Sequence, residues 1–550
     1  MIKENHINKI NSNSKILYNG KIHIMDEEQN QVESIYIKGS KILDYGTDLY
    51  ILKKYSEISY KKIDLKNKTV LPGINDSHMH LLMYGQSLES IDLRGAKSVS
   101  EIIKICSDFL ENNKLREDQW LLGMGWNQDL FEKNEFPSKE DLDKISTEIP
   151  ISLTRVCRHI TACNTKALEV MNIIRETDIE GGEIEKDSRG NLTGVLKENA
   201  LSFVNKSQPE LSVEDIKIIL EKAAKKLEEY GITSVQSDDL QHGGKSWENV
   251  IEAYRQLYNE DRLNIRVNQQ CLFFELDEYL NFLNKINKKD IIKNKFKIGP
   301  LKLLGDGSLG ARTAYMSEPY NDDIKKTGIT AYTEKQLDEL VLTATKHDMP
   351  VAIHAIGDKM IDRALNSIKK AKKETNKNLR NGIVHCQITT EDIFEKFKET
   401  NTGVYIQPIF TASDWNIVGK RIGEERTKIS YNWKRLYDLG INVSFGTDSP
   451  VESPNPYENI YAAVTRKDLN GNPEEGWLPD QKLSLEESLE AYTKNPSYMS
   501  YEEDIKGTLE KGKIADLVVI NKDIFSTNPE KIKNIKAVMT IIDGEIVHEL

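Results

Sequence analysis

Two histidines separated by one residue, His78 and His80, follow an apolar run in the segment VLPGINDSHMH at residues 70–80. In an extended segment, side chains two residues apart point to the same side, so both imidazoles can reach one metal ion. Two surface imidazoles at the end of a strand would give the same pattern. The pair therefore predicts a metal site only in combination with further ligands.

Three more candidate ligands follow other apolar, strand-like segments: His354 in VAIHAIGD, His385 in GIVHCQ and Asp448 in VSFGTDSP. Taken singly, each histidine could be satisfied by a neighbouring carbonyl, and the aspartate could cap a turn. However, the chain has only 10 histidines, and four of them stand at predicted strand ends. This clustering favours one shared metal site, in which Asp448 could also take a proton from bound water.

Lys302 stands inside the apolar segment FKIGPLKLLGDG. A lysine amine in its neutral form can react with carbon dioxide to give a carbamate, an anionic ligand able to bridge two metal ions. Alternatively, the amine simply extends to solvent at the end of the strand. The residues alone leave both interpretations open.

The elements that must position these residues alternate between helices and strands. In DIKIILEKAAKKLEEYGITSVQ, at residues 215–236, apolar residues recur at helical spacing, a glycine ends the helix, and a β-branched strand follows. The unit recurs up to INVSFGTDSP, which predicts an α/β fold with a (β/α)8 TIM-like barrel over residues 70–504. Reactive residues of such barrels lie at the carboxyl ends of the strands, where all six candidates are found.

The two ends of the chain have a different sequence pattern. They contain short predicted strands, in which β-branched residues recur at every second position, and Asn-Gly, Gly-Ser and Asp-Gly turns. Neither end has enough strands for a stable sheet by itself. We therefore expect residues 1–69 and 505–550 to form one smaller β-sandwich domain together. A turn-rich section at about residues 110–210 interrupts the alternation of strands and helices. We expect this section to be an insertion over the barrel mouth.

The composition of the chain argues against nucleic-acid binding, membrane insertion and a disulfide framework. The 550 residues carry a net charge of −12 in a mixed pattern, which argues against nucleic-acid binding. No apolar run reaches the roughly 18 residues of a membrane span, and the polar N-terminus resembles no signal peptide, so we expect a cytoplasmic protein without membrane contact. Five scattered cysteines without a CxxC pair indicate reduced thiols and a metal bound through nitrogen and oxygen. The expected partners are a small-molecule substrate and a second copy in a homodimer.

The sequence resembles the metal-dependent amidohydrolase superfamily, and most closely its YtcJ-like branch, amidohydrolase family 3. The resemblance covers nearly all the chain and rests on the segments VLPGINDSHMH, GMGWNQ, LTRVCRH, TGVLKENA, GITSVQSDD, KLLGDGSLGARTA, AIHAIGDKMID, VHCQ, FGTDSPV, NPYENIYAAVTRKD and KGKIADLVVI.

This resemblance implies one or two divalent metal ions, usually zinc, and a ligand set made of His78, His80, His354, His385 and Asp448. It also implies that Lys302 is the position carboxylated in relatives with two metals. The implied reaction is attack of metal-bound hydroxide on a carbonyl, imine or formamide carbon, which cleaves a carbon–nitrogen bond other than a peptide bond. Asp448 would be catalytic and carry the proton to the leaving nitrogen.

Four residues match branch positions that could contact substrate: Trp126, Arg155, His159 and Arg312. One segment departs from the expected pattern, because GITSVQSD stands where relatives often read GVTSVHD. Gln236 and Ser237 therefore precede Asp238, and the role of Gln236 is left open.

Three alternatives remain. Residues 305–310, GDGSLG, fit the G-x-G-x-x-G fingerprint of a dinucleotide site, which requires a following helix. A deaminase of the same superfamily would use one metal and leave Lys302 unmodified. A sensor or regulatory protein could keep the barrel without catalysis.

Overall fold

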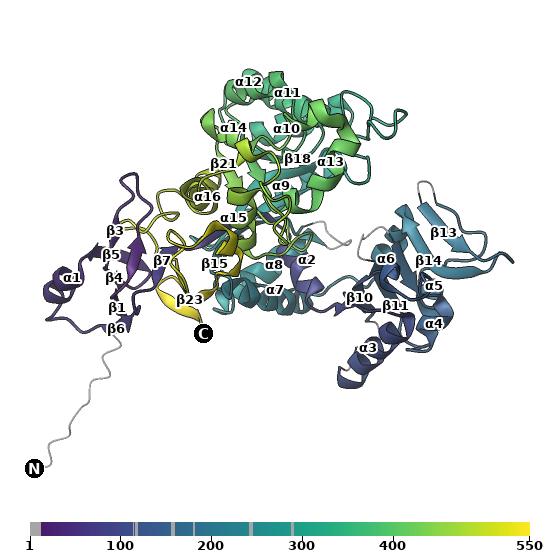
Figure 1. Ribbon diagram of the computed structural model, residues 1–550, viewed down its shortest axis with the longest axis horizontal. Helices are drawn as coiled ribbons and strands as arrows, with labels where there is room; N and C mark the ends of the chain where they lie inside the picture. Colours follow the sequence, from purple (N-terminus) through teal and green to yellow (C-terminus); the bar gives the residue numbers. More distant parts are fainter. Residues whose placement is uncertain are drawn as a thin grey trace, which may run out of the picture. The chain divides into compact units, whose positions relative to one another are not determined.

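The computed structural model describes residues 13–113, 115, 119–155, 160–179, 182–240, 246–287 and 291–550 (Figure 1). The chain divides into two compact units. The first, here called the barrel unit, comprises Met1–Leu81, Leu220–Asp239 and Ile251–Leu550, and the second unit comprises Leu82–Ile219 and Leu240–Val250.

An eight-stranded parallel sheet is the centre of the barrel unit. Its strands are β8 (Ile74–Met79), β15 (Ile232–Ser237), β16 (Arg266–Leu272), β17 (Phe296–Leu304), β18 (Val351–Ala355), β19 (Gly382–His385), β20 (Gly403–Ile406) and β21 (Val443–Phe445). Each pairs with the next in this order. Beyond the last strand, Asp448 N donates to His78 O at 2.8 Å and His80 N donates to Ser449 O at 2.9 Å, which joins β21 to β8. The predicted (β/α)8 barrel is therefore confirmed.

Helices follow the strands as the periodicity predicts. They are α7 (Val213–Glu228), α8 (Trp247–Asn259), α9 (Leu276–Lys285), α10 (Glu334–Lys346), α11 (Asp358–Thr375), α12 (Glu391–Thr400), α13 (Phe410–Thr427), α14 (Trp433–Asp438), α15 (Pro456–Thr465), α16 (Leu485–Tyr492) and α17 (Lys494–Met499). Gly231 lies between α7 and β15 with a φ of +82°, a conformation that favours glycine. Among the described residues, no helix combines the length and hydrophobicity needed to cross a bilayer.

Strands from both chain ends form two further sheets of the barrel unit. The first contains β1 (Ser14–Tyr18), β4 (Ser34–Lys38), β5 (Lys41–Gly46) and β6 (Lys61–Asp64), flanked by α1 (Asp48–Lys54). The second contains β2 (Lys21–His23), β3 (Gln31–Val32), β7 (Thr69–Pro72), β22 (Leu517–Ile520), β23 (Ala537–Ile542) and β24 (Glu545–Glu549).

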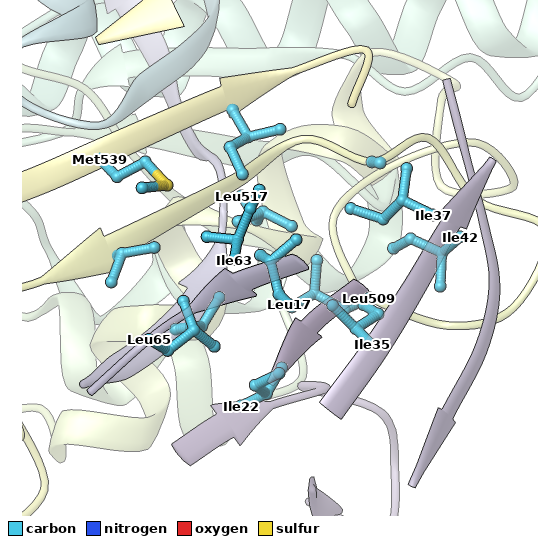
Figure 2. Packing of buried hydrophobic residues seen from close by; sticks show 14 of the residues in the cluster. Leu17, Ile22, Ile35, Ile37, Ile42, Ile63, Leu65, Leu509, Leu517 and Met539 are labelled. Carbon is cyan, nitrogen blue, oxygen red and sulfur yellow. The ribbon is translucent and has the colours of Figure 1, made fainter. Parts of the chain in front are cut away.

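The two ends are joined by strand pairing and by one apolar cluster. Val519 of β22 pairs antiparallel with Val70 of β7. Figure 2 shows N-terminal side chains such as Leu17 packed with C-terminal ones such as Leu517 and Met539. The domain boundaries at residues 69 and 505 stay predictions.

The second unit has its own sheet and cores. Its strands are β9 (Ile91–Asp92), β10 (Leu121–Trp126), β11 (Ile151–Arg155), β12 (Ile160–Cys163), β13 (Gly182–Lys186) and β14 (Leu192–Glu198). Its helices include α3 (Val99–Asn112), α4 (Lys139–Asp143), α5 (Thr165–Val170) and α6 (Ser202–Ser207). The sheet mixes parallel and antiparallel pairs, unlike the barrel. The expected location of an insertion over the barrel mouth stays a prediction.

Candidate metal centre

Two histidines and one aspartate converge where β8 meets the end of β21. His78 lies in β8, His80 follows that strand, and Asp448 follows β21. Asp448 Oδ1 lies 3.3 Å from His78 Nε2 and 3.0 Å from His80 Nε2. One ligand atom from each of the three residues lies within 4.8 Å of the others. Imidazole nitrogen and carboxylate oxygen are the donor types that zinc and similar divalent ions accept, so this set fits a metal ion.

The other two histidines form an adjacent pair. His354 stands in β18 and His385 ends β19, so neighbouring strands present them at the same end of the barrel. His354 Nδ1 and His385 Nε2 are 3.0 Å apart. The ring centroids of His385 and His78 are 6.0 Å apart, which connects this pair to the first cluster. The structure thus brings all five predicted ligands to one site, and their role as ligands stays a prediction.

Lys302 of β17 also reaches this site. Its Nζ lies 3.1 Å from His78 Nε2 and 3.4 Å from Asp238 Oδ2, and the lysine side chain is only 1% exposed. Asp238 directly follows β15, and its Oδ2 lies 3.7 Å from His80 Nδ1. Asp238 is therefore a functional candidate that the sequence analysis did not select, although an acidic residue directly after a barrel strand was an available signal.

Burial and charge set the protonation of the cluster. Burial, reinforced by the Lys302 cation, lowers the pKa of both His78 and His354 to about 4, so both imidazoles are neutral. Burial also lowers the pKa of His80, but the carboxylates of Asp238 and Asp448 outweigh it and raise that pKa to about 10. Burial opposes ionisation of Asp448, yet its bonds to the histidines hold its pKa well below the usual range.

Two glutamines contact the histidine rings from the side opposite the cluster. Gln270 of β16 places Oε1 2.8 Å from His78 Nδ1, and Gln407, which follows β20, places Oε1 2.7 Å from His385 Nδ1. Neither glutamine was predicted from the sequence. Gln270 is one of several polar residues in β16, and Gln407 directly follows the apolar strand β20; neither signal specifies a partner.

The GDGSLG segment supports the loops at this end of the barrel. Asp306 accepts hydrogen bonds from the backbone N–H groups of Ile356, Gly357 and Tyr315 at 3.0, 2.8 and 2.8 Å. No helix occurs within residues 305–332, all of which are described, and α10 begins only at Glu334. A dinucleotide site needs a helix N-terminus to hold the pyrophosphate, so the dinucleotide interpretation is wrong.

The predicted substrate-contact residues have different surroundings. Trp126 is 0% exposed within an apolar core of the second unit, and its Nε1 donates to Leu153 O at 2.7 Å. Trp126 therefore packs in this core, and its expected contact with substrate stays a prediction. Arg155 donates to Gln128 Oε1 at 2.7 Å and Asn127 Oδ1 at 3.0 Å.

Arg312 and His159 complete the set of predicted substrate contacts. Arg312 makes a two-bonded ion pair with Asp322, at 3.0 and 2.9 Å. This pair uses two of the five guanidinium N–H donors, and the expected substrate contact of Arg312 stays a prediction. His159 lies outside the described residues.

Gln236, whose role the sequence left open, makes side-chain hydrogen bonds with Pro496 and Asn268. Its Nε2 donates to Pro496 O of α17 at 2.9 Å, and its Oε1 accepts from Asn268 Nδ2 at 3.3 Å. The residue is 1% exposed. Gln236 of β15 therefore links β16 and α17 through hydrogen bonds.

Comparison with known proteins agrees with this geometry. The amidohydrolase family model matches residues 61–548. YtcJ of Bacillus subtilis (strain 168) is 30% identical over 97% of this chain and 99% of its own. The N-substituted formamide deformylase of Arthrobacter pascens is 22% identical over 97% of this chain and 98% of its own.

A solved structure extends the similarity to three dimensions. An uncharacterized metal-dependent hydrolase from Pyrococcus horikoshii OT3 has a TM-score of 0.79 at 30% identity, covering 94% of this chain and 99% of that one. Since the family model, a relative of nearly equal length and the barrel all agree, this chain belongs to the amidohydrolase family of metal-dependent hydrolases.

Proposed function

We propose that this hydrolase cleaves a carbon–nitrogen bond in a non-peptide amide, an N-acyl compound or a formamide. The convergence of His78, His80 and Asp448 at one end of the barrel is the observation that carries the proposal. The similarity to a protein named N-substituted formamide deformylase, which extends over 97% of this chain, supports the bond type.

The proposed cofactor is one or two divalent ions, with zinc as the favoured metal because the donors are nitrogen and oxygen. His78, His80 and Asp448 would hold an ion, and His354 and His385 would contribute to the same centre. When bound, the metal would supply Lewis acidity that activates water and polarises the substrate carbonyl. In a site with two ions, a carboxylated Lys302 would be the anionic bridge.

Asp448 is the proposed catalytic base and acid. Its ionised carboxylate can accept the proton of the attacking water and then donate it to the leaving nitrogen, a role that requires hydrogen-bonding reach to both. His80 Nε2, 3.0 Å from Asp448 Oδ1, fixes the carboxylate. His78 Nε2 lies 3.3 Å from the same oxygen, so an ion bound there would contact both residues.

The test combines metal content with a substrate panel. Protein grown with zinc and bicarbonate is assayed on N-formyl, N-acyl and cyclic amides and on amine-bearing substrates of deaminases, before and after removal of metal by a chelator. We expect metal-dependent hydrolysis of at least one amide class. Ammonia release from amines alone would instead identify a deaminase, and full metal occupancy without turnover would favour a sensor.

Metal count and lysine chemistry test the two-metal form separately. Two ions per chain, together with a mass increase of one carbon dioxide at Lys302, are the expected results. One ion and a free amine would contradict the two-metal form and leave a mononuclear hydrolase.

A further inference from the structure

We infer that Gln270 and Gln407 are positioning residues that fix the tautomers of His78 and His385, so that the Nε2 lone pairs of both rings face the metal centre. This inference rests on the proposed metal-dependent function. It assigns a task to two residues that neither touch the reacting atoms nor carry charge.

The orientation of the Gln270 amide determines the proton position on His78. Gln270 Nε2 donates to Ser77 O at 3.1 Å, so the amide oxygen must be the atom 2.8 Å from His78 Nδ1. A flipped amide would set its oxygen against the Ser77 carbonyl, where two acceptors would face each other. Since the amide oxygen only accepts, Nδ1 carries the hydrogen.

The remaining nitrogen of His78 then has a lone pair. A histidine that ligates a metal ion does so as a neutral imidazole, which has only one N–H. Lys302 Nζ, a donor, lies 3.1 Å from His78 Nε2, as this tautomer requires. Asp448 Oδ1 lies 3.3 Å from the same nitrogen, so two acceptor atoms meet there and a cation between them would be stabilised by both.

Gln407 repeats the arrangement at His385. Gln407 Nε2 donates to Tyr405 O at 3.1 Å, and Oε1 lies 2.7 Å from His385 Nδ1. As a proposed ligand, this ring is likewise a neutral imidazole with one N–H. The Phe410 ring stacks on it at an interplanar angle of 13°, which limits rotation of the imidazole. His385 Nε2 is therefore the lone-pair nitrogen.

In His354 the hydrogen is on Nε2 and the lone pair on Nδ1, the reverse of His78 and His385. Its Nε2 lies 3.3 Å from Gly307 O and 3.4 Å from Asp306 Oδ1, and both atoms are acceptors, so Nε2 carries the hydrogen. Its Nδ1 lone pair then faces His385 Nε2 at 3.0 Å. Two lone pairs at this distance repel, and a shared cation removes the repulsion. The glutamines thus create an acceptor-lined site before any ion binds.

The choice of an amide also has a chemical consequence. A carboxylate partner raises the basicity of a ligating imidazole, whereas an uncharged amide fixes the tautomer with less electron donation. Both glutamines are buried, with 0% exposure for Gln270 and 1% for Gln407, so water does not replace them.

The first test reads the tautomers directly in the wild-type protein. Nitrogen-15 NMR of labelled histidines in the metal-free full chain distinguishes the protonated from the unprotonated ring nitrogen. We expect His78 and His385 to be Nδ1–H tautomers and His354 to be the Nε2–H tautomer. An Nε2–H signal from His78 or His385 would overturn the inference, whatever the enzyme's activity.

The second test measures zinc affinity by competition with a chromophoric chelator in four variants. Gln270→Leu and Gln407→Leu remove the acceptor and should weaken zinc binding about 10–100-fold, the usual effect of removing an outer-shell partner. Gln270→Glu and Gln407→Glu keep the acceptor oxygen for Nδ1 but set the second oxygen against the carbonyl of Ser77 or Tyr405, so their zinc affinity should lie between that of the leucine variants and wild type.

The matched control is Gln236→Leu, a buried glutamine on a neighbouring strand that should leave zinc affinity unchanged. Equal affinities for the leucine variants and this control would overturn the inference. If the wild type binds no zinc, the proposed function fails, while the NMR experiment still decides the tautomers.

Discussion

Glu228, the last residue of α7, is a buried carboxyl whose ionisation should destabilise the protein. It is 4% exposed, and its Oε1 accepts from Asn264 Nδ2 at 3.1 Å. Burial outweighs this bond and the nearby Lys225 cation and raises the pKa of Glu228 from 4.5 to about 7. The position at a helix C-terminus also disfavours a negative charge.

The sign of the pH dependence follows from this direction. Because the folded-state pKa lies above the unfolded-state value, the folded protein holds the proton more tightly, and the stabilisation is complete below pH 4.5. It is lost as pH rises through about 7. At about 1.4 kcal/mol per pKa unit, the loss is about 3 kcal/mol. For a chain of this length, that corresponds to about 3 °C in melting temperature.

Glu228→Gln removes the ionisation while keeping an oxygen for Asn264. Melting curves at pH 4 and pH 8 should show equal midpoints for variant and wild type at pH 4, and a variant midpoint about 3 °C higher at pH 8. Contributions from the histidine cluster are common to both proteins and cancel. Glu229→Gln, at the next and exposed residue, is the control and should change neither midpoint. A difference between variant and wild type that is the same at both pH values would refute the reasoning.

Three further substitutions test the site and the framework. Asp448→Asn should lower kcat/KM about 10²–10⁴-fold on the substrate found in the panel, and steady-state kinetics with unchanged turnover would exclude the proposed proton transfer. Arg266→Met leaves the carboxylates of Asp516 and Asp543 without the guanidinium that binds Asp516 at 2.6 and 2.9 Å. It should lower the free energy of unfolding by about 3–5 kcal/mol in urea titrations, whereas an unchanged urea midpoint would show that the network is dispensable. Leu517→Ala, in the core shared by the two chain ends (Figure 2), should cost about 2–5 kcal/mol; a loss below about 1 kcal/mol would mean that the site collapses around the cavity.

Much of the barrel was predictable because its signals are local. Helical spacing in α7, the glycine at 231 and the β-branched strand after it each act over a few residues. The structure places those elements as predicted. The likeness of the two chain ends was also readable, since turn pairs and alternating strands are local features. Which strand pairs with which, such as β7 with β22, depends on contacts between residues far apart in the sequence.

The positions of the candidate ligands were predictable for a topological reason. Parallel strands of a closed barrel all deliver their carboxyl ends to one rim, so His78, His354 and His385 had to converge once the barrel was recognised. Trp126 shows the limit of this reasoning. Its segment predicts a substrate contact, which stays a prediction. The buried position of the indole and the hydrogen bond from its N–H to Leu153 O could not be read from that segment.

By itself, the sequence determined the barrel, the family resemblance and the residue types gathered at the rim. Only the tertiary structure decided how those residues are held: that Asp238 joins Lys302, and that Gln270 faces His78 across 192 residues of chain. The physical reason is that residue type and spacing specify which groups reach a strand end. The partner of each group, and hence its proton and its charge, depends on side chains brought together only when the sheet closes.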